Sequence, residues 1–169
     1  MIDKRNTTLK EDIKKQSDWI VKAFEVDGYM LDFSISSLME IDVFFEKNLI
    51  DGRPKHRGRL SKNFGGIVFS ISSYVAETLI RNVSTFKLIT DDNDPQGEVN
   101  FSIEFPDGTV CWPAQKIIKR IQNGIEDGVY PYGYDLTKEY ISETFNDDYW
   151  KIGKTINNAE NKKGWWKFW

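Results

Sequence analysis

The chain has 169 residues, of which 40% are hydrophobic and 14% aromatic, and its formal net charge is −3. This length suits one ordinary hydrophobic core, and the apolar content excludes a wholly disordered chain. The mildly acidic balance argues against general nucleic-acid binding, because that affinity comes from neutralising phosphates.

Cysteine usage and hydropathy set two further limits. Cys111 is the single cysteine, so neither a disulfide framework nor a cysteine-based zinc site can form within the chain. The residues after Met1 lack a signal-peptide core, and no apolar run approaches the ~20 residues of a membrane-spanning helix. We therefore expect a cytoplasmic protein without cofactor or metal.

Helical periodicity marks the first elements of the chain. Residues 9–26 carry apolar positions on one face and charges on the other, which predicts an amphipathic helix. A second helix is expected next, with Leu38, Ile41, Phe45 and Leu49 on one face. The basic residues of 52–62, interrupted by glycine and proline, predict a loop.

The stretch from Gly65 to Asp127 organises the rest of the chain. Its first part is apolar on most sides, which predicts a central helix over about 65–82. Alternation over 99–105 then predicts a strand. The further expected elements are a weak third strand at 84–90, a turn at 106–108, a partner strand at 109–112, a helix that begins at Pro113 and stops at Gly128, and a last helix at 136–145.

These elements predict an α+β fold. We expect one domain over residues 1–150, with four to five helices packed on a small antiparallel sheet of about three strands. Residues 151–169 form a separate basic, tryptophan-rich tail.

One acid stands among the apolar residues of the central helix. Glu77 precedes Arg81 by one helical turn, and a buried acid needs a partner because an isolated dry charge is costly. We interpret the two as a structural ion pair. A catalytic carboxylate is the alternative, and it would need a second acid or base that the sequence does not identify.

The other catalytic sets are also incomplete. A Cys–His pair would have to join Cys111 to His56, but a cysteine in a strand beside Trp112 is typical of a small core residue. One histidine cannot form a histidine-based metal centre. The sequence therefore predicts a protein that is not an enzyme.

Acids and tyrosines gather in two segments that could meet a partner. Rigid aromatic side chains beside acids are common in protein-binding surfaces, and equally common in loops that cover a core. The predicted partner-binding residues are Asp91, Asp92, Asp94, Glu126, Asp127, Tyr130, Tyr132, Tyr134 and Asp135.

The end of the chain is basic and aromatic. From Lys151 onward five lysines face the single acid Glu160, which leaves a charge of −7 for residues 1–150. Tryptophan beside lysine suits docking on a protein surface or anchoring at a membrane interface. The residues expected to do this are Trp165, Trp166, Phe168 and Trp169.

Several short motifs resemble a loosely defined family of small bacterial proteins without an assigned activity. They are Asp32-x-Ser34-x-x-Ser37-Leu38, Gly65-Gly66, Tyr74-x-x-Glu77, Pro106-Asp107-Gly108, and Pro113 with Lys119-Arg120. Ala76 departs from the pattern, where relatives have glycine. The resemblance implies an α+β fold and supplies no catalytic residues, and some such proteins resemble immunity proteins of bacterial toxins.

Together these observations predict a non-enzymatic protein-binding module. We expect an immunity-type inhibitor that neutralises a basic bacterial toxin by direct binding, without nucleic acid as a partner. The alternative is a peripheral membrane or scaffold-associated protein attached through residues 151–169.

Overall fold

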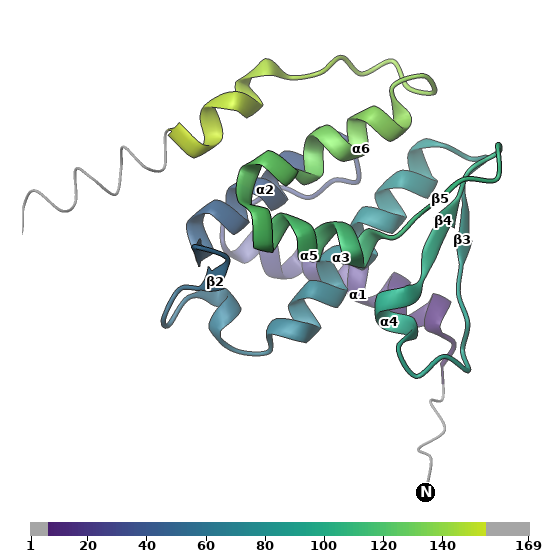
Figure 1. Cartoon of the computed structure of the whole chain (residues 1–169), viewed down its shortest axis with the longest axis horizontal. Coiled ribbons are helices and arrows are strands. Elements are labelled where there is room, and N and C mark those ends of the chain that lie inside the picture. Colours follow the sequence, from purple (N-terminus) through teal and green to yellow (C-terminus); the bar gives the residue numbers. More distant parts are fainter. Residues whose placement is uncertain (1–6, 155–169) are drawn as a thin grey trace, which may run out of the picture.

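The computed structural model describes residues 7–154 and combines helices with two small antiparallel sheets (Figure 1). The α-helices are α1 (Leu9–Val26), α2 (Leu38–Asn48), α3 (Phe64–Asn82), α4 (Gly97–Asn100), α5 (Pro113–Asn123) and α6 (Val129–Thr137). The strands are β1 (Leu49–Ile50), β2 (Arg53–Pro54), β3 (Lys87–Ile89), β4 (Ser102–Glu104) and β5 (Val110–Cys111). Short 3-10 helices lie at η1 (Arg59–Ser61), η2 (Gly124–Asp127) and η3 (Asp147–Lys151). The prediction of a mixed fold with a small antiparallel sheet is confirmed, but the described residues contain more helices than expected and a second sheet.

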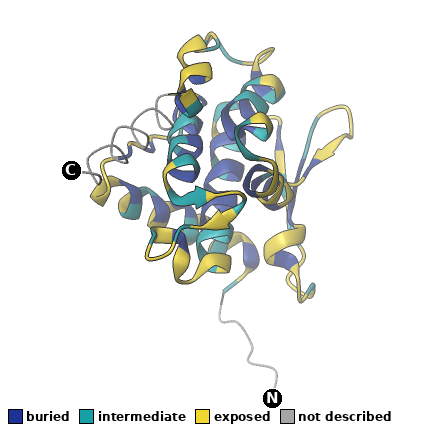
Figure 2. Ribbon diagram, turned by 60° about the vertical axis from the view of Figure 1, so that its left-hand side comes forward, coloured by how far each residue is buried: buried dark blue, intermediate teal, exposed yellow. Residues whose placement is uncertain are grey.

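Helix α3 lies at the centre of the core, as its apolar sequence predicts. Ile71, Tyr74, Val75 and Leu79 are fully buried on it, and Figure 2 shows the buried parts of the helices gathered in the middle of the molecule. Its buried serines do not disturb the helix, because their hydroxyls donate to carbonyl oxygens one turn earlier. The prediction of a central helix is therefore confirmed.

Helix α1 covers α3 over much of its length. It begins with a capping box, in which the Thr8 hydroxyl accepts from the Glu11 N–H and the Glu11 carboxylate accepts from the Thr8 N–H. Ile13, Ile20 and Phe24 face the core. The predicted and observed ranges of this helix are the same.

The strands β3, β4 and β5 form one antiparallel sheet in that order. The turn between β4 and β5 is the predicted one, since Gly108 has a φ of 83° and the Asp107 carboxylate accepts from the Thr109 N–H and hydroxyl. The first half of the predicted strand 99–105 is wrong. Residues 97–100 form the single turn α4, because the Asp94 carboxylate accepts from the N–H of Gln96 and from the Asn100 amide.

The C-terminal part differs most from the sequence prediction. Helix α5 begins at Pro113 as predicted but ends at Asn123 rather than at Gly128, and it is followed by Gly124, whose φ of 77° suits glycine. The tyrosines of 129–134 lie in helix α6, and the predicted helix 136–145 does not form. Instead the chain turns back along α6, because the Asn146 N–H donates to the Tyr130 hydroxyl and the Phe145 ring stacks on the Tyr130 ring at 5.0 Å.

Among residues 7–154, no helix has both the length and the apolar character that crossing a bilayer requires.

Candidate functional site

The acids of the β3–α4 loop remain at the surface, but two of them also hold the fold. Asp92 Oδ1 accepts from the Leu9 N–H at 2.6 Å, so it caps the start of α1 from a distant part of the chain. The Asp94 carboxylate accepts hydrogen bonds from the Asn100 amide and the Gln96 N–H, and these bonds lower the pKa of the Asp94 carboxyl. Asp91 accepts from the Asn93 N–H within the loop. The charges of this loop are therefore held in fixed positions.

The three tyrosines predicted to meet a partner lie in helix α6. Tyr130 is only 1% exposed and contacts Phe145 and Tyr149, so its prediction as a partner-binding residue is wrong. Tyr132 and Tyr134 are half-buried against the core. The physical reason is that α6 turns this face toward α2 and α3, and composition alone does not separate a core tyrosine from a surface one.

The acids around α6 keep more exposure. Glu126 and Asp135 are exposed, and the Asp135 carboxylate lies 3.0 Å from Lys138 Nζ. Asp127 accepts from Lys116 Nζ at 2.9 Å. Hydrogen bonds from Asn123 and Lys116 lower the pKa of the Asp127 carboxyl.

Glu77 and Arg81 lie next to each other on α3. Glu77 Oε2 is 3.2 Å from Arg81 Nε, and the Arg81 guanidinium also lies 3.6 Å from the centre of the Phe33 ring. A cation over an aromatic face adds to the attraction. The geometry is that of an ion pair which fastens the loop before α2 to the end of α3.

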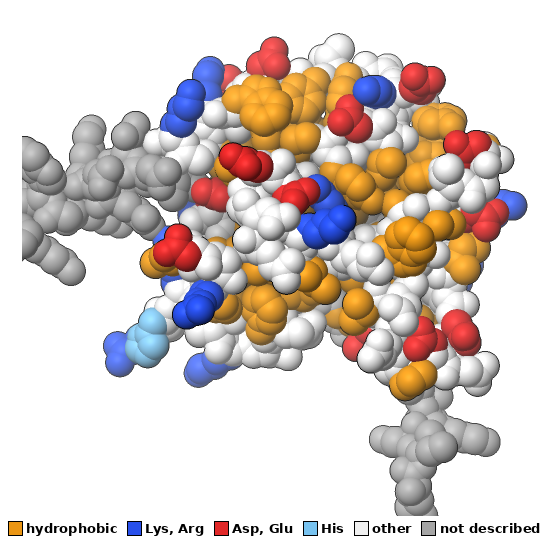
Figure 3. All heavy atoms as spheres, viewed as in Figure 1, with side chains coloured by type: hydrophobic (Ala, Val, Ile, Leu, Met, Phe, Trp, Pro, Cys, Tyr) orange, Lys and Arg blue, Asp and Glu red, His pale blue; other side chains and the backbone are white. Residues whose placement is uncertain are grey.

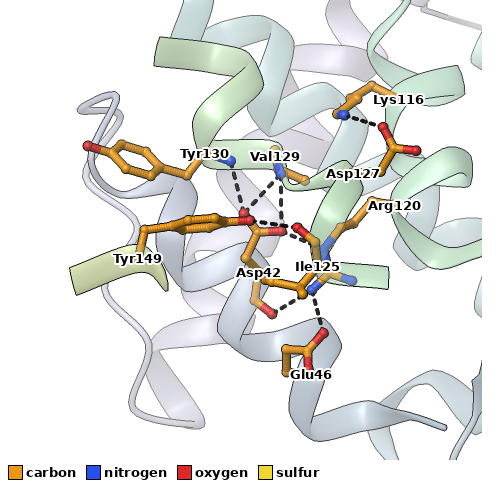
Figure 4. A network of polar contacts seen from close by, with 9 residues as sticks. All are labelled: Asp42, Glu46, Lys116, Arg120, Ile125, Asp127, Val129, Tyr130 and Tyr149. Atoms are coloured by element: carbon orange, nitrogen blue, oxygen red, sulfur yellow. Dashed lines mark hydrogen bonds and ion pairs between the residues drawn. The ribbon is translucent and has the colours of Figure 1, made fainter. Parts of the chain in front are cut away.

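A buried ion pair that the sequence analysis missed joins α2 to α5. Asp42 and Arg120 are 0% and 1% exposed, and Arg120 Nε donates to Asp42 Oδ1 at 2.6 Å (Figure 4). Arg120 Nη2 donates to the Asp42 carbonyl oxygen and, at 2.9 Å, to Glu46 Oε1. Both charges are thus paired inside the core, which reduces the cost of their burial.

Asp42 also holds the start of helix α6. Its carboxylate accepts from the N–H groups of Val129 and Tyr130, each at 2.9 Å at the closest. Burial raises the pKa of the Asp42 carboxyl, while the guanidinium of Arg120 and the Tyr130 N–H oppose part of that rise. One carboxylate therefore connects α2, α5 and α6.

Tyr149 of η3 closes this network. Its hydroxyl donates to the Ile125 carbonyl oxygen at 3.1 Å (Figure 4), and burial together with the charge of Asp42 raises the pKa of its phenol. A Cβ at Gly128 would overlap the Tyr149 hydroxyl, so glycine is needed there for packing.

Among the described residues, the most exposed aromatic side chains with acids beside them follow α6. We call residues 138–150 the acidic aromatic segment. Tyr140 is 54% exposed and Trp150 60% exposed. Tyr140 leans on the Phe86 ring with centroids 5.4 Å apart, and Trp150 leans on Phe145 at 5.9 Å. Both rings are therefore held by the core while one side faces solvent.

Four acids accompany these two rings. They are Glu139, Glu143, Asp147 and Asp148. The segment runs along the upper edge of the molecule in Figure 1, and in the same view Figure 3 shows acidic and hydrophobic side chains interspersed along that edge. The sequence predicted a helix over 136–145 and did not identify Tyr140 or Trp150 as exposed aromatic residues.

Cys111 lies in edge strand β5 and is buried, as a core residue would be. Burial raises the pKa of its thiol, although the Tyr132 hydroxyl opposes part of that rise. In the described part of the chain, no group of three His, Cys, Asp or Glu side chains is placed to hold a metal ion.

The predicted tail residues Trp165, Trp166, Phe168 and Trp169 lie outside the described residues. Comparisons of the chain with protein-family models, with curated proteins and with solved structures found no match. The resemblance to small bacterial proteins therefore stays a prediction.

Proposed function

We propose that this chain is a non-enzymatic protein-binding module that works as an immunity-type inhibitor, neutralising a basic bacterial toxin by direct contact. The observation that carries the proposal is the acidic aromatic segment, in which Tyr140 and Trp150 are exposed yet rest on the more buried rings of Phe86 and Phe145. A supported ring loses little conformational freedom on binding, so more of its buried area counts toward affinity.

The negative charge of the chain favours a basic partner. Residues 1–150 carry a charge of −7, and Glu139 and Asp147 are exposed beside the two rings. Complementary charges speed encounter and suppress wrong partners, whereas buried aromatic anchors supply most of the binding energy. A basic partner whose apolar contact patch covers both rings fits this pattern.

Affinity capture from the producing cells tests the proposal. The wild-type chain should retain a basic protein that stops growth when it is expressed alone, and co-expression of the chain should restore growth. The double variant Tyr140→Ala/Trp150→Ala should bind that partner at least tenfold more weakly, since truncating an anchor costs roughly 2 kcal/mol or more. The matched control Val26→Ala/Met30→Ala removes exposed apolar side chains elsewhere and should bind normally. Equal binding by both double variants, or a captured partner that is harmless, contradicts the proposal.

The second candidate is attachment to a membrane or scaffold through residues 151–169, and it is favoured by the Trp-Lys composition of that stretch. Removal of residues 164–169 separates the two candidates. If the tail is an anchor, the shortened chain stops sedimenting with anionic phosphatidylserine vesicles. If pelleting is unchanged, the anchor is refuted.

A further inference from the structure

A cavity of about 440 Å³ lies between α2, the β1–β2 turn and the C-terminal end of α5. Arg120 and Glu46 line it from the buried ion network, and Asp51 lines it from the turn. This volume falls within the roughly 300–1,000 Å³ of small-molecule pockets. The cavity is separate from the acidic aromatic segment, so a ligand bound in it does not depend on the proposed function.

One nitrogen of the buried guanidinium is left for a ligand. Arg120 uses Nε for Asp42 and Nη2 for Asp42 and Glu46, whereas Nη1 has no hydrogen-bond partner within residues 7–154. The Arg120 side chain is 1% exposed. Nη1 is nevertheless not among the fully enclosed atoms without a partner, which in the described part of the chain are Ser17 Oγ and Thr78 Oγ1. Figure 4 shows this nitrogen pointing away from both carboxylates. Since Arg120 also lines the cavity, an oxygen acceptor bound there against the guanidinium would satisfy these N–H donors.

Apart from Arg120, the charged side chains among the lining residues are both acidic, and the other lining residues are apolar or neutral. Asp51 is exposed and forms no ion pair with another described residue. A Cβ at Gly52 would lie 3.1 Å from the Ile121 carbonyl oxygen, so the turn sits against the C-terminal carbonyls of α5. These carbonyls lack partners inside the helix and carry partial negative charge.

The charged groups that line the cavity indicate which class of ligand it would bind. Two carboxylates, Glu46 and Asp51, face the cavity together with one guanidinium whose charge Asp42 already offsets. A simple anion would be repelled by the excess negative charge, and a simple cation would leave the Arg120 donors unsatisfied. A molecule with a carboxylate at one end and an ammonium group at the other satisfies both sides.

We propose that this cavity binds a free α-amino acid. Its carboxylate accepts from Arg120 Nη1, and its ammonium group donates to the carboxylates of Glu46 and Asp51. The cavity exists only in the folded chain, where Arg120 connects α2 with α5. A ligand bound there therefore stabilises the folded state by mass action.

Calorimetry and thermal unfolding of the full chain test the site with glycine, L-alanine and L-leucine as probes. At least one of them should bind saturably and should raise the melting temperature of the chain. Titration up to about 10 mM amino acid is enough to detect a Kd of about 1 mM. Acetate and methylammonium, which carry only one of the two charges, should do neither. Absence of saturable binding by all three amino acids, or equal binding of acetate, overturns the proposal.

Variants then locate the site. Asp51→Asn should weaken amino-acid binding about tenfold, the loss of one charge-assisted hydrogen bond. Asp51 has a φ of 50°, and asparagine tolerates that conformation, so the fold should be kept. Glu46→Gln should weaken binding similarly. The control Glu126→Gln removes an exposed acid outside the cavity and should leave binding unchanged. If neither Asp51→Asn nor Glu46→Gln alters the affinity, the assignment is wrong.

Discussion

Substitution of Asp42 perturbs the structure at its most connected polar residue. The Asp42 carboxylate is 0% exposed and accepts from Arg120 Nε at 2.6 Å and from the N–H groups of Val129 and Tyr130 at 2.9 Å. Asp42→Ala removes all of these acceptors at once. It leaves the Arg120 charge with Glu46 as its only carboxylate partner among the described residues.

The cost comes from the groups that are left unpaired. Breaking a buried ion pair by removing one partner costs about 3–5 kcal/mol, and each backbone N–H left without an acceptor adds about 1–3 kcal/mol unless water reaches it. These terms overlap, so we expect Asp42→Ala to lower the free energy of unfolding by about 4–6 kcal/mol. For a domain of this size, that is a melting temperature lower by about 8–24 °C. The loss is a large part of the roughly 5–15 kcal/mol that holds a domain together.

Urea unfolding followed by far-UV circular dichroism measures the effect. Asp42→Asn keeps one acceptor oxygen and should cost less than Asp42→Ala, and the exposed control Asp147→Asn should stay within about 0.5 kcal/mol of the wild type. The double variant Asp42→Leu/Arg120→Met should lose less than the sum of its single variants, because an apolar pair needs no partner. A cost below about 1 kcal/mol for Asp42→Ala would refute the reasoning.

The remaining predictions concern one thiol, one carboxyl and two glycines. The Cys111 thiol is buried with a raised pKa, so Ellman's reagent should label it slowly in the native chain and fully in urea. The pKa of Asp127 lies below its ordinary value of 3.8, so its contribution to stability is present above about pH 4 and is lost as the pH falls through the lowered pKa. Asp127→Asn should flatten the decrease in unfolding free energy over that acidic range, measured by urea titrations. Gly133→Ala should destabilise by about 1–3 kcal/mol because its Cβ would overlap Leu38 Cδ1. Gly65→Ala, with nothing within 4 Å of its Cβ, should be neutral or stabilise by up to about 1 kcal/mol, measured by the same unfolding curves.

Elements specified by neighbouring residues could be predicted from the sequence. The predicted bounds of helix α1 match the observed ones because its amphipathic period is a local property of the sequence. The turn at 106–108 needs only a proline, an aspartate and a glycine that can take positive φ. Alternation at 99–101 misled the prediction, because the hydrogen bonds of Asp94 one turn earlier favour helix α4 over an extended chain.

Features that join distant residues could not be predicted in the same way. The Tyr130 hydroxyl accepts from the Asn146 N–H, 16 residues away. This contact belongs to a chain that turns back after α6, where the sequence predicted a helix over 136–145. In the folded chain Tyr140 and Trp150 are exposed and Tyr130 is buried, an arrangement that residue composition alone does not indicate.

The rule that identified Glu77 as needing a partner applies equally to Asp42. Asp42 follows Ile41 and precedes Phe44 and Phe45 on a helix whose apolar face was recognised, and Arg120 lies beside inward-facing Ile121 on another. Glu77 was paired correctly because its cation lies four residues away, within reach on the same helix. The partner of Asp42 lies 78 residues away, and sequence period places each charge on a buried face without saying which faces meet. An acid and an arginine that both fall on apolar faces of different helices are therefore a usable signal for a buried pair, because neither charge can be buried without the other.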